Sequence, residues 1–303
     1  MIFQMMICLG VTKKGTKCTH KVKPNETFCG FHRKVNNKTL SPRPSTPPSP
    51  LSSSVASTDE PIVPQRTNSL CKHYQKLQED LKDNCKDLSL IQTHFQKCVK
   101  GYHLINSSVI NETIWEDINV LVFASLGIEI VSKSDGSHLS GMDINCSLGR
   151  ISNKSAKYNN GCIDISSYRL TNVCSDKNVG TVKDILQEIN KRKNFDYYSF
   201  IVREEKRGLI HYDWYLIPSD YTPLNPSSYT WKPTIGKRGK GVGAQVGWNT
   251  DEIDGCKMSI SFSMSSQLWI HLKVTDALKQ FIIASTEVSN QPKYNYMQIA
   301  DLL

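Results

Sequence analysis

One short stretch of the chain carries side chains that could hydrolyse a phosphodiester bond. In "SGMDINCSLGRISNKSAK", Asp143 precedes two Ser-x-Lys triplets, Ser152-Asn153-Lys154 and Ser155-Ala156-Lys157. Residues Leu148-Gly149-Arg150-Ile151 can form the tip of a hairpin, which would place Asp143 beside the 152–157 segment. Phosphodiester hydrolysis needs hard oxygen ligands for Mg²⁺, a positive charge and a positioned water. The stretch therefore predicts a metal-binding carboxylate next to a lysine.

A second carboxylate has to come from another segment. The sequence "NETIWEDINVLVFASLG" predicts a helix from about residue 111 to 126, which Gly127 ends. Glu116 lies on this helix and is a candidate for the second ligand. Glu112 and Asp117 stay open as alternatives, because one sequence does not fix which face of the helix meets the hairpin.

Residues 110–175 resemble the PD-(D/E)xK nuclease superfamily, whose fold is restriction-endonuclease-like. The resemblance rests on "GMDI" with Asp143, on "ISNKS" with Ser152 and Lys154, and on Glu116 in the preceding helix. It implies that Asp143 and Glu116 hold Mg²⁺, while Lys154 stabilises the pentavalent phosphate and helps to deprotonate water. Ser152 or Ser155 stands where the family usually has an acid, so the second carboxylate must come from elsewhere, and Glu116 is the preferred source. The implied activity is Mg²⁺-dependent, site-specific cleavage of double-stranded DNA by a homodimer, as in type II restriction enzymes.

The choice between the two lysines rests on the residues around them. Lys154 follows an apolar residue, Ile151, at the third position before it, whereas Lys157 has Lys154 at that position. Lys154 is therefore the preferred catalytic lysine, and Lys157 is expected to contact phosphate. The alternative is that the acids and lysines of this region are ordinary surface charges.

A Cys/His cluster near the N-terminus has the composition of a zinc site. Cys8, Cys18, Cys29 and His32 are separated by nine, ten and two residues. Four such ligands suffice for a structural Zn²⁺, which would have to stabilise a segment with almost no core of its own. Reduced, unlinked thiols are the alternative. The stretch resembles zinc motifs of the "TKKGTxC…CxxH" kind, found in proteins of large DNA viruses and in some cellular nucleic-acid enzymes.

The charge of the chain favours a polyanionic partner. Lysine and arginine exceed aspartate and glutamate by 37 to 28, which gives a net charge of +9. In "WKPTIGKRGKGVGAQVGWN", the basic residues Lys237, Arg238 and Lys240 could contact DNA, or the loop could be a solvated hairpin tip. It lacks the Gly-Lys-Ser/Thr ending of a phosphate-binding P-loop.

Composition divides the chain into three parts. Residues 1–37 form the zinc module, residues 38–70 are a Ser/Pro-rich disordered linker, and residues 71–303 form the main domain. Apolar positions predict one long helix or a helix pair over 70–100, and helices and strands follow in the order helix, strands, helix, strands. We therefore expect an α/β (α+β) domain with a central mixed sheet flanked by helices, in a restriction-endonuclease-like arrangement.

The remaining features set the cellular setting and the competing functions. No secretory signal and no apolar run of bilayer length is evident, which predicts an intracellular, cytoplasmic protein with reduced cysteines. His211 and His271 fall within alternating strands and are expected to be packed or structural. The competing functions are a non-enzymatic, zinc-containing nucleic-acid-binding protein and an interaction protein that self-associates through residues 70–100.

Overall fold

The computed structural model describes residues 6–7, 21–22, 66–134, 141–237 and 242–300. The chain forms two units, Met1–Ile62 and Val63–Leu303. In the first unit, β1 (Met6–Ile7) pairs antiparallel with β2 (Lys21–Val22). The predicted zinc ligands and most of the predicted linker lie outside the described residues. The first helix of the second unit begins at Arg66, so the last five residues assigned to the linker are helical.

The second unit is built on one eleven-stranded mixed sheet with the order β13-β8-β7-β5-β6-β12-β11-β10-β9, and β4 joins β3 to β5 at the side. Among the named strands of the described ranges, only β5 and β7 are paired in parallel. The mixed α+β class predicted from the sequence is confirmed. The strands are β3 (Ile130–Lys133), β4 (Ile144–Cys146), β5 (Gly149–Asn159), β6 (Cys162–Arg169), β7 (Tyr197–Lys206), β8 (Leu209–Pro218), β9 (Trp231–Ile235), β10 (Gln245–Thr250), β11 (Cys256–Ser261), β12 (Gln267–Lys273) and β13 (Ile282–Ser289).

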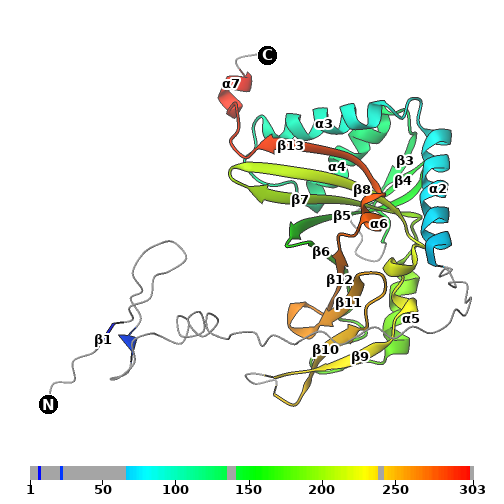
Figure 1. Ribbon diagram of the computed structural model, residues 1–303, viewed down its shortest axis with the longest axis vertical. Coiled ribbons are helices and arrows are strands. Elements are labelled where there is room, and N and C mark those ends of the chain that lie inside the picture. Colours follow the sequence, from blue (N-terminus) through cyan, green and yellow to red (C-terminus); the bar gives the residue numbers. More distant parts are fainter. Residues whose placement is uncertain (1–5, 8–20, 23–65, 135–140, 238–241, 301–303) are drawn as a thin grey trace, which may run out of the picture. The chain divides into compact units, whose positions relative to one another are not determined.

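Helices flank this sheet, and two of them matter most for the site. Figure 1 shows α3 and α4 lying together over the β13, β8 and β7 half of the sheet, with α5 beside the other half. No helix in the described ranges is long and apolar enough to cross a membrane. The helices are α2 (Arg66–Asn84), α3 (Leu90–His103), α4 (Glu112–Ser125), α5 (Val182–Arg192), α6 (Asp276–Lys279) and α7 (Tyr296–Ala300), with 3-10 turns at Thr222–Leu224, Pro226–Ser228 and Phe262–Met264.

Aromatic side chains fasten α3 and α4 to the sheet. Phe95 of α3 and Trp115 and Phe123 of α4 surround Trp214 of β8, with ring centroids 5.4 to 5.7 Å from that of Trp214. All four side chains are fully buried. Such contacts add to the hydrophobic gain of burial, so this cluster fixes where α4 lies on the sheet.

The hairpin that was predicted around residues 148–151 forms, but its tip lies earlier. Cys146 pairs with Gly149, so Ser147 and Leu148 make the turn. Leu148 is buried, and Gly149 has φ 131°, a conformation that residues with a Cβ rarely adopt. These two residues place the turn, and β5 already begins at Gly149.

Candidate active site

The strand β5 changes its partner in the middle, and this opens a gap in the sheet. On one edge, β5 pairs with β4 over Gly149–Ile151 and with β6 over Lys157–Asn159. Residues 152–156 pair with neither of these strands, although β7 continues along the other edge. We call this unpaired edge of β5, residues 152–156, the fork. At the fork, groups from other segments can therefore take the place of a neighbouring strand.

Asp143 is the residue just before β4, and its carboxylate lies at the fork. Its backbone N–H donates to the carbonyl of Ile151 at 2.8 Å. Its carboxylate Oδ2 accepts a hydrogen bond from the backbone N–H of Asn153 at 2.6 Å. The hairpin register therefore brings Asp143 beside the Ser152–Lys154 triplet, as the sequence indicated.

The first turns of α4 bring further carboxylates to the same place. Asn111 caps the helix by accepting from the N–H of Ile114 at 3.0 Å. Glu112 and Glu116 are four residues apart and so share one face of the helix. Lys154 Nζ lies 2.7 Å from Glu112 Oε1 and 3.7 Å from Asp143 Oδ2. Lys154 thus links the helix to the hairpin.

Of the three helical acids considered from the sequence, two face the fork. Glu112 contacts Lys154 directly, and the charges of Asp143, Glu112 and Lys154 all act on Glu116. Asp117 instead forms an exposed ion pair of 2.7 Å with Lys133. Glu116 keeps its place beside Asp143, and Glu112 joins it as the direct partner of the lysine.

Burial and like charge disturb the titration of these acids. Burial, together with the negative charges of Asp143 and Glu112, raises the pKa of Glu116 to about 7. Burial also raises the pKa of Asp143, although Lys154 and the Asn153 N–H oppose that rise. A carboxyl group with a raised pKa in such a cluster is stabilised as an anion when a cation arrives.

Lys154 stays charged in this environment. Its side chain is 12% exposed. Burial alone would lower the pKa of Lys154, but the carboxylates of Glu112 and Asp143 outweigh burial and leave that pKa above its ordinary value. A buried ammonium held by acids is a fixed positive charge, which is what a developing negative phosphate requires.

Asn153, between Ser152 and Lys154, is tied into the site at three points. Its N–H donates to Asp143, its carbonyl accepts from Lys154 Nζ at 2.6 Å, and its side-chain Oδ1 accepts from Asn119 Nδ2 of α4 at 2.6 Å. The Asn119 amide also donates to Ser199 Oγ of β7 at 2.9 Å. Asn119 and Asn153 are fully buried, so this network anchors the fork to α4.

Neither Asn119 nor Asn153 could be singled out from the sequence. An asparagine within an apolar helix stretch, four residues after a tryptophan, is a weak signal of a buried polar contact. The residue that it meets lies 34 positions away, so their contact depends on how α4 packs against β5.

The other residues predicted for the site lie in different surroundings. Ser152 is buried, and a hydrogen bond from its side chain favours the ionised form of Asp143. Lys157 lies beyond the fork, half exposed, in a 3.2 Å ion pair with Glu205. Lys237 is exposed at the end of β9, whereas Arg238 and Lys240 lie outside the described residues.

The acids of the fork fit Mg²⁺ better than a metal bound by protein alone. No group of three or more His, Cys, Asp or Glu side chains in the described ranges is close enough to hold an ion. Mg²⁺ usually takes one or two carboxylates and completes its shell with water and substrate phosphate oxygens. Asp143 and Glu116 would supply those two carboxylates.

The two strand histidines are less enclosed than the sequence suggested. The His211 side chain is 42% exposed and lies 3.0 Å from Asp213 Oδ1. His271 Nδ1 lies 2.6 Å from Asp164 Oδ1, and its Nε2 is 2.9 Å from Ser259 Oγ. Both histidines are partnered on the sheet and do not reach the fork.

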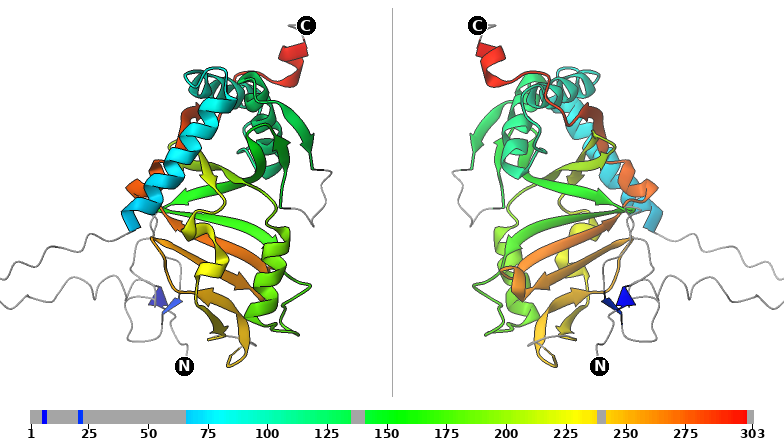
Figure 2. Two further views of the ribbon diagram at one scale, coloured as in Figure 1. Left: turned by 90° about the vertical axis from the view of Figure 1, so that its right-hand side faces the viewer. Right: turned by 90° about the vertical axis from the view of Figure 1, so that its left-hand side faces the viewer.

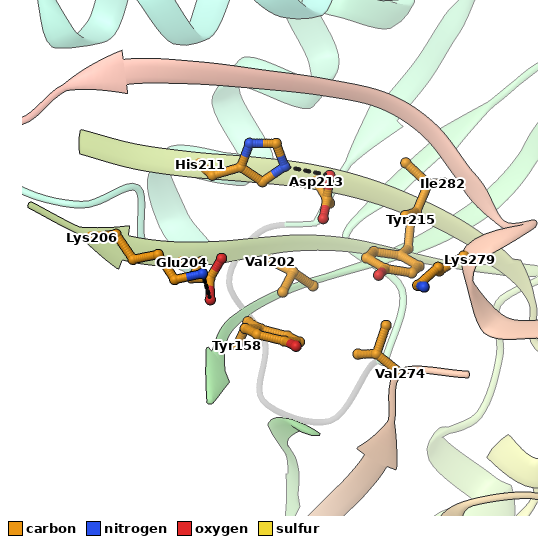
Figure 3. Close-up of a pocket in the computed structure, with 10 residues that line it drawn as sticks. All are labelled: Tyr158, Val202, Glu204, Lys206, His211, Asp213, Tyr215, Val274, Lys279 and Ile282. Carbon is orange, nitrogen blue, oxygen red and sulfur yellow. Dashed lines mark hydrogen bonds and ion pairs between the residues drawn. The ribbon is translucent and has the colours of Figure 1, made fainter. Parts of the chain in front are cut away.

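A separate cavity of about 350 Å³ lies near the far end of β5 and is drawn in Figure 3. Tyr158, Val202 and Tyr215 line it together with charged groups at its rim. Those charges are already matched, because Glu204 pairs with Lys206 and Lys279 with Asp276, as His211 does with Asp213. The cavity therefore lacks the unbalanced acids that distinguish the fork.

Comparison of the chain with family models, with curated proteins and with solved structures gives no match. The chemistry of the fork is therefore argued from its own geometry and charge.

Proposed function

We propose that the chain is a Mg²⁺-dependent endonuclease that hydrolyses phosphodiester bonds of double-stranded DNA, with a restriction-endonuclease-like main domain. One observation carries the proposal: Asp143, Lys154 and Glu116, from the hairpin and a separate helix, converge on the unpaired edge of β5. An ordinary surface pair would not need a buried lysine between acids whose pKa values are raised.

The residues that meet at the fork each have a part in this reaction. Asp143 and Glu116 would hold Mg²⁺, and the bound ion would supply polarisation of the phosphate and a lowered pKa of water. Lys154 offsets the negative charge that grows on the phosphate. Glu112 holds Lys154 in position through the 2.7 Å contact. Asn153 fixes the carboxylate of Asp143 and the ammonium of Lys154 relative to each other.

The rest of the chain adds to this function. In our proposal, Cys8, Cys18, Cys29 and His32 hold a structural Zn²⁺ in residues 1–37. Cutting both strands of a duplex requires two active sites, so the chain acts as a homodimer. The net charge of +9 supports an anionic substrate.

Cleavage of supercoiled plasmid by the full chain tests the proposal. We expect nicked and linear products with Mg²⁺ and none with excess EDTA. Lys154→Met and Asp143→Asn should each lower the rate by at least about 100-fold, because each removes charge that acts in the transition state. The matched control is Lys206→Met. Lys206 also lies 2.7 Å from a carboxylate, that of Glu204, but is 71% exposed on β7, so the rate should stay unchanged.

The lysine variants also separate the alternatives. Lys157→Ala should cut at the normal rate when DNA is saturating, because Lys157 lies outside the fork. Cleavage in EDTA would refute the metal mechanism. Binding of DNA without cleavage by the unaltered chain under any divalent ion would instead favour a non-enzymatic binding protein. Normal rates in both fork variants would dismiss this site.

A further inference from the structure

Five strands beyond the fork form a sheet with two unlike faces. The strands β6, β12, β11, β10 and β9 lie side by side in Figures 1 and 2. Along β11 and β12, burial alternates strictly, and the inward residues, among them Met258, Ile260 and Ile270, are buried. The outward residues are polar or charged, apart from Trp269. We call the outward side of these five strands the polar face.

Cross-strand register shows which side chains share the polar face. Lys232 pairs with Asn249, Asn249 with Ser259, and Ser259 with Trp269. Directly opposed residues of neighbouring strands point to the same side of a sheet. One row therefore carries a lysine, two hydrogen-bonding side chains and an aromatic ring from β9 to β12.

A second row joins the polar face to the fork. Lys257 is opposite His271, His271 is opposite Asp164, and Asp164 is opposite Lys157 of β5. Ser155 of the fork is two residues from Lys157 on β5, so these two side chains share one side of the sheet, whereas the side chain of Lys154 starts from the opposite side. The polar face thus reaches the unpaired edge of β5.

The charges of the polar face are unbalanced. Arg169, Lys232 and Lys257 are exposed, and none of them forms an ion pair with another described residue. Asp164 is the carboxylate in the two rows, and its hydrogen-bond partner is His271 at 2.6 Å. A stable antiparallel sheet needs only polar residues on its solvent side, so the excess of unpaired cations calls for a partner.

We propose that the polar face is the docking surface for the sugar–phosphate backbone of duplex DNA, which it leads to the fork. The inference rests on the proposed function for its choice of duplex DNA. Most protein contacts to DNA go to phosphates through Arg, Lys, Ser and Asn side chains, the residue types found here. Five strands spaced about 4.8 Å apart span about 19 Å, over which a duplex carries about eleven phosphate charges.

The test measures duplex binding by the full chain bearing Lys154→Met, so that cleavage cannot interfere. A blunt 30-base-pair duplex is titrated in EDTA at several KCl concentrations. The face variant adds Arg169→Gln, Lys232→Gln and Lys257→Gln. The control variant instead adds Lys72→Gln, Lys82→Gln and Lys97→Gln, which remove three equally exposed charges from α2 and α3. Any contribution of the basic N-terminal segment is the same in all three proteins.

We expect the face variant to bind at least tenfold more weakly, and its slope of log K against log salt to be shallower by up to about 3, since each lost phosphate contact removes about 0.9. The control variant should keep the affinity and slope of its parent. Equal affinity in the face variant and its parent would overturn the inference, even if the unaltered chain cuts plasmid. Weakened binding by the face variant, with no cleavage by the unaltered chain, would support the docking surface and refute the nuclease.

Discussion

Replacing Lys154 by methionine tests the electrostatics of the fork without any assumption about substrate. Methionine is close to lysine in length and keeps the apolar part of the side chain, so the change removes mainly the charge. Lys154 is 12% exposed and Asp143 is 17% exposed, with 3.7 Å between Nζ and Oδ2. The variant therefore leaves the Asp143 carboxylate buried without its cation.

The expected cost follows from this geometry. Removing one partner of a buried ion pair typically costs 3–5 kcal/mol, because the remaining charge stays desolvated. Glu112 is 40% exposed and can regain water, and Asp143 keeps the hydrogen bond from Asn153. We therefore expect the free energy of unfolding to fall by about 3 kcal/mol at pH 8, the lower end of that range.

The loss of stability caused by Lys154→Met should depend on pH in a defined direction. In the wild type, the pKa of Asp143 is already raised above its ordinary value, and loss of Lys154 raises it further. A carboxyl group whose folded-state pKa is raised costs stability progressively as the pH rises above its unfolded value. Lys154 has a raised pKa and stays charged in both states below pH 8. The deficit of the variant should therefore shrink from pH 8 to pH 5.

Urea unfolding followed by tryptophan fluorescence measures this cleanly, because all five tryptophans lie in the Val63–Leu303 unit. Asp143→Asn, combined with Lys154→Met, should recover about 2 kcal/mol of the summed single losses, since neither partner of the Asp143–Lys154 pair then remains as a charge without the other. Lys206→Met removes an exposed partner and should change stability by under about 1 kcal/mol at every pH. A pH-independent loss with additive single variants would refute this account of the fork.

Three further predictions concern other parts of the chain. Because the pKa of Glu116 is about 7, Mg²⁺ binding at pH 7 should release about half a proton, measured by calorimetry in buffers of different ionisation enthalpy, and Glu116→Gln should abolish that release. Asn119→Leu should lower the free energy of unfolding by about 2–3 kcal/mol, because Asn153 loses a buried donor, and urea titration would show it. Cys29→Ser should remove zinc, measured by atomic absorption, while the tryptophan fluorescence midpoint stays unchanged.

The parts of the site that the sequence predicted are those set by local geometry. The α4 helix is marked by a cap at Asn111 and an apolar run, and the hairpin by its predicted tip at residues 148–151. A hairpin in this region brings Asp143 close to residues 152–157, but the turn lies at Ser147 and Leu148, and this register sets Asp143 opposite Ser152. The proximity of Asp143 and Lys154 could therefore be predicted, and the register could not.

The parts that could not be predicted depend on contacts between distant segments. The fork exists because β6 pairs with β5 only over Lys157–Asn159, while β7 pairs in parallel along the other edge of β5. Whether Glu112 or Asp117 faces the fork depends on the rotation of α4 about its axis. The contact of Trp115 with Trp214, about a hundred residues apart in sequence, sets that rotation. Strands β9, β10 and β13 were not predicted from the sequence either, and β13 finds its partner β8 only through a distant contact.

The fork also differs in kind from the other ion pairs of the molecule. Lys133 with Asp117 and Lys206 with Glu204 are exposed pairs that water can screen. At the fork, burial raises the pKa of Asp143 and Glu116, so the folded chain holds their negative charges at a cost to its own stability. A bound cation would remove that cost, and the free energy released would strengthen binding of the cation. The chain keeps buried negative charge where a bound metal ion would offset it, and this is the main physical support for the proposed catalytic site.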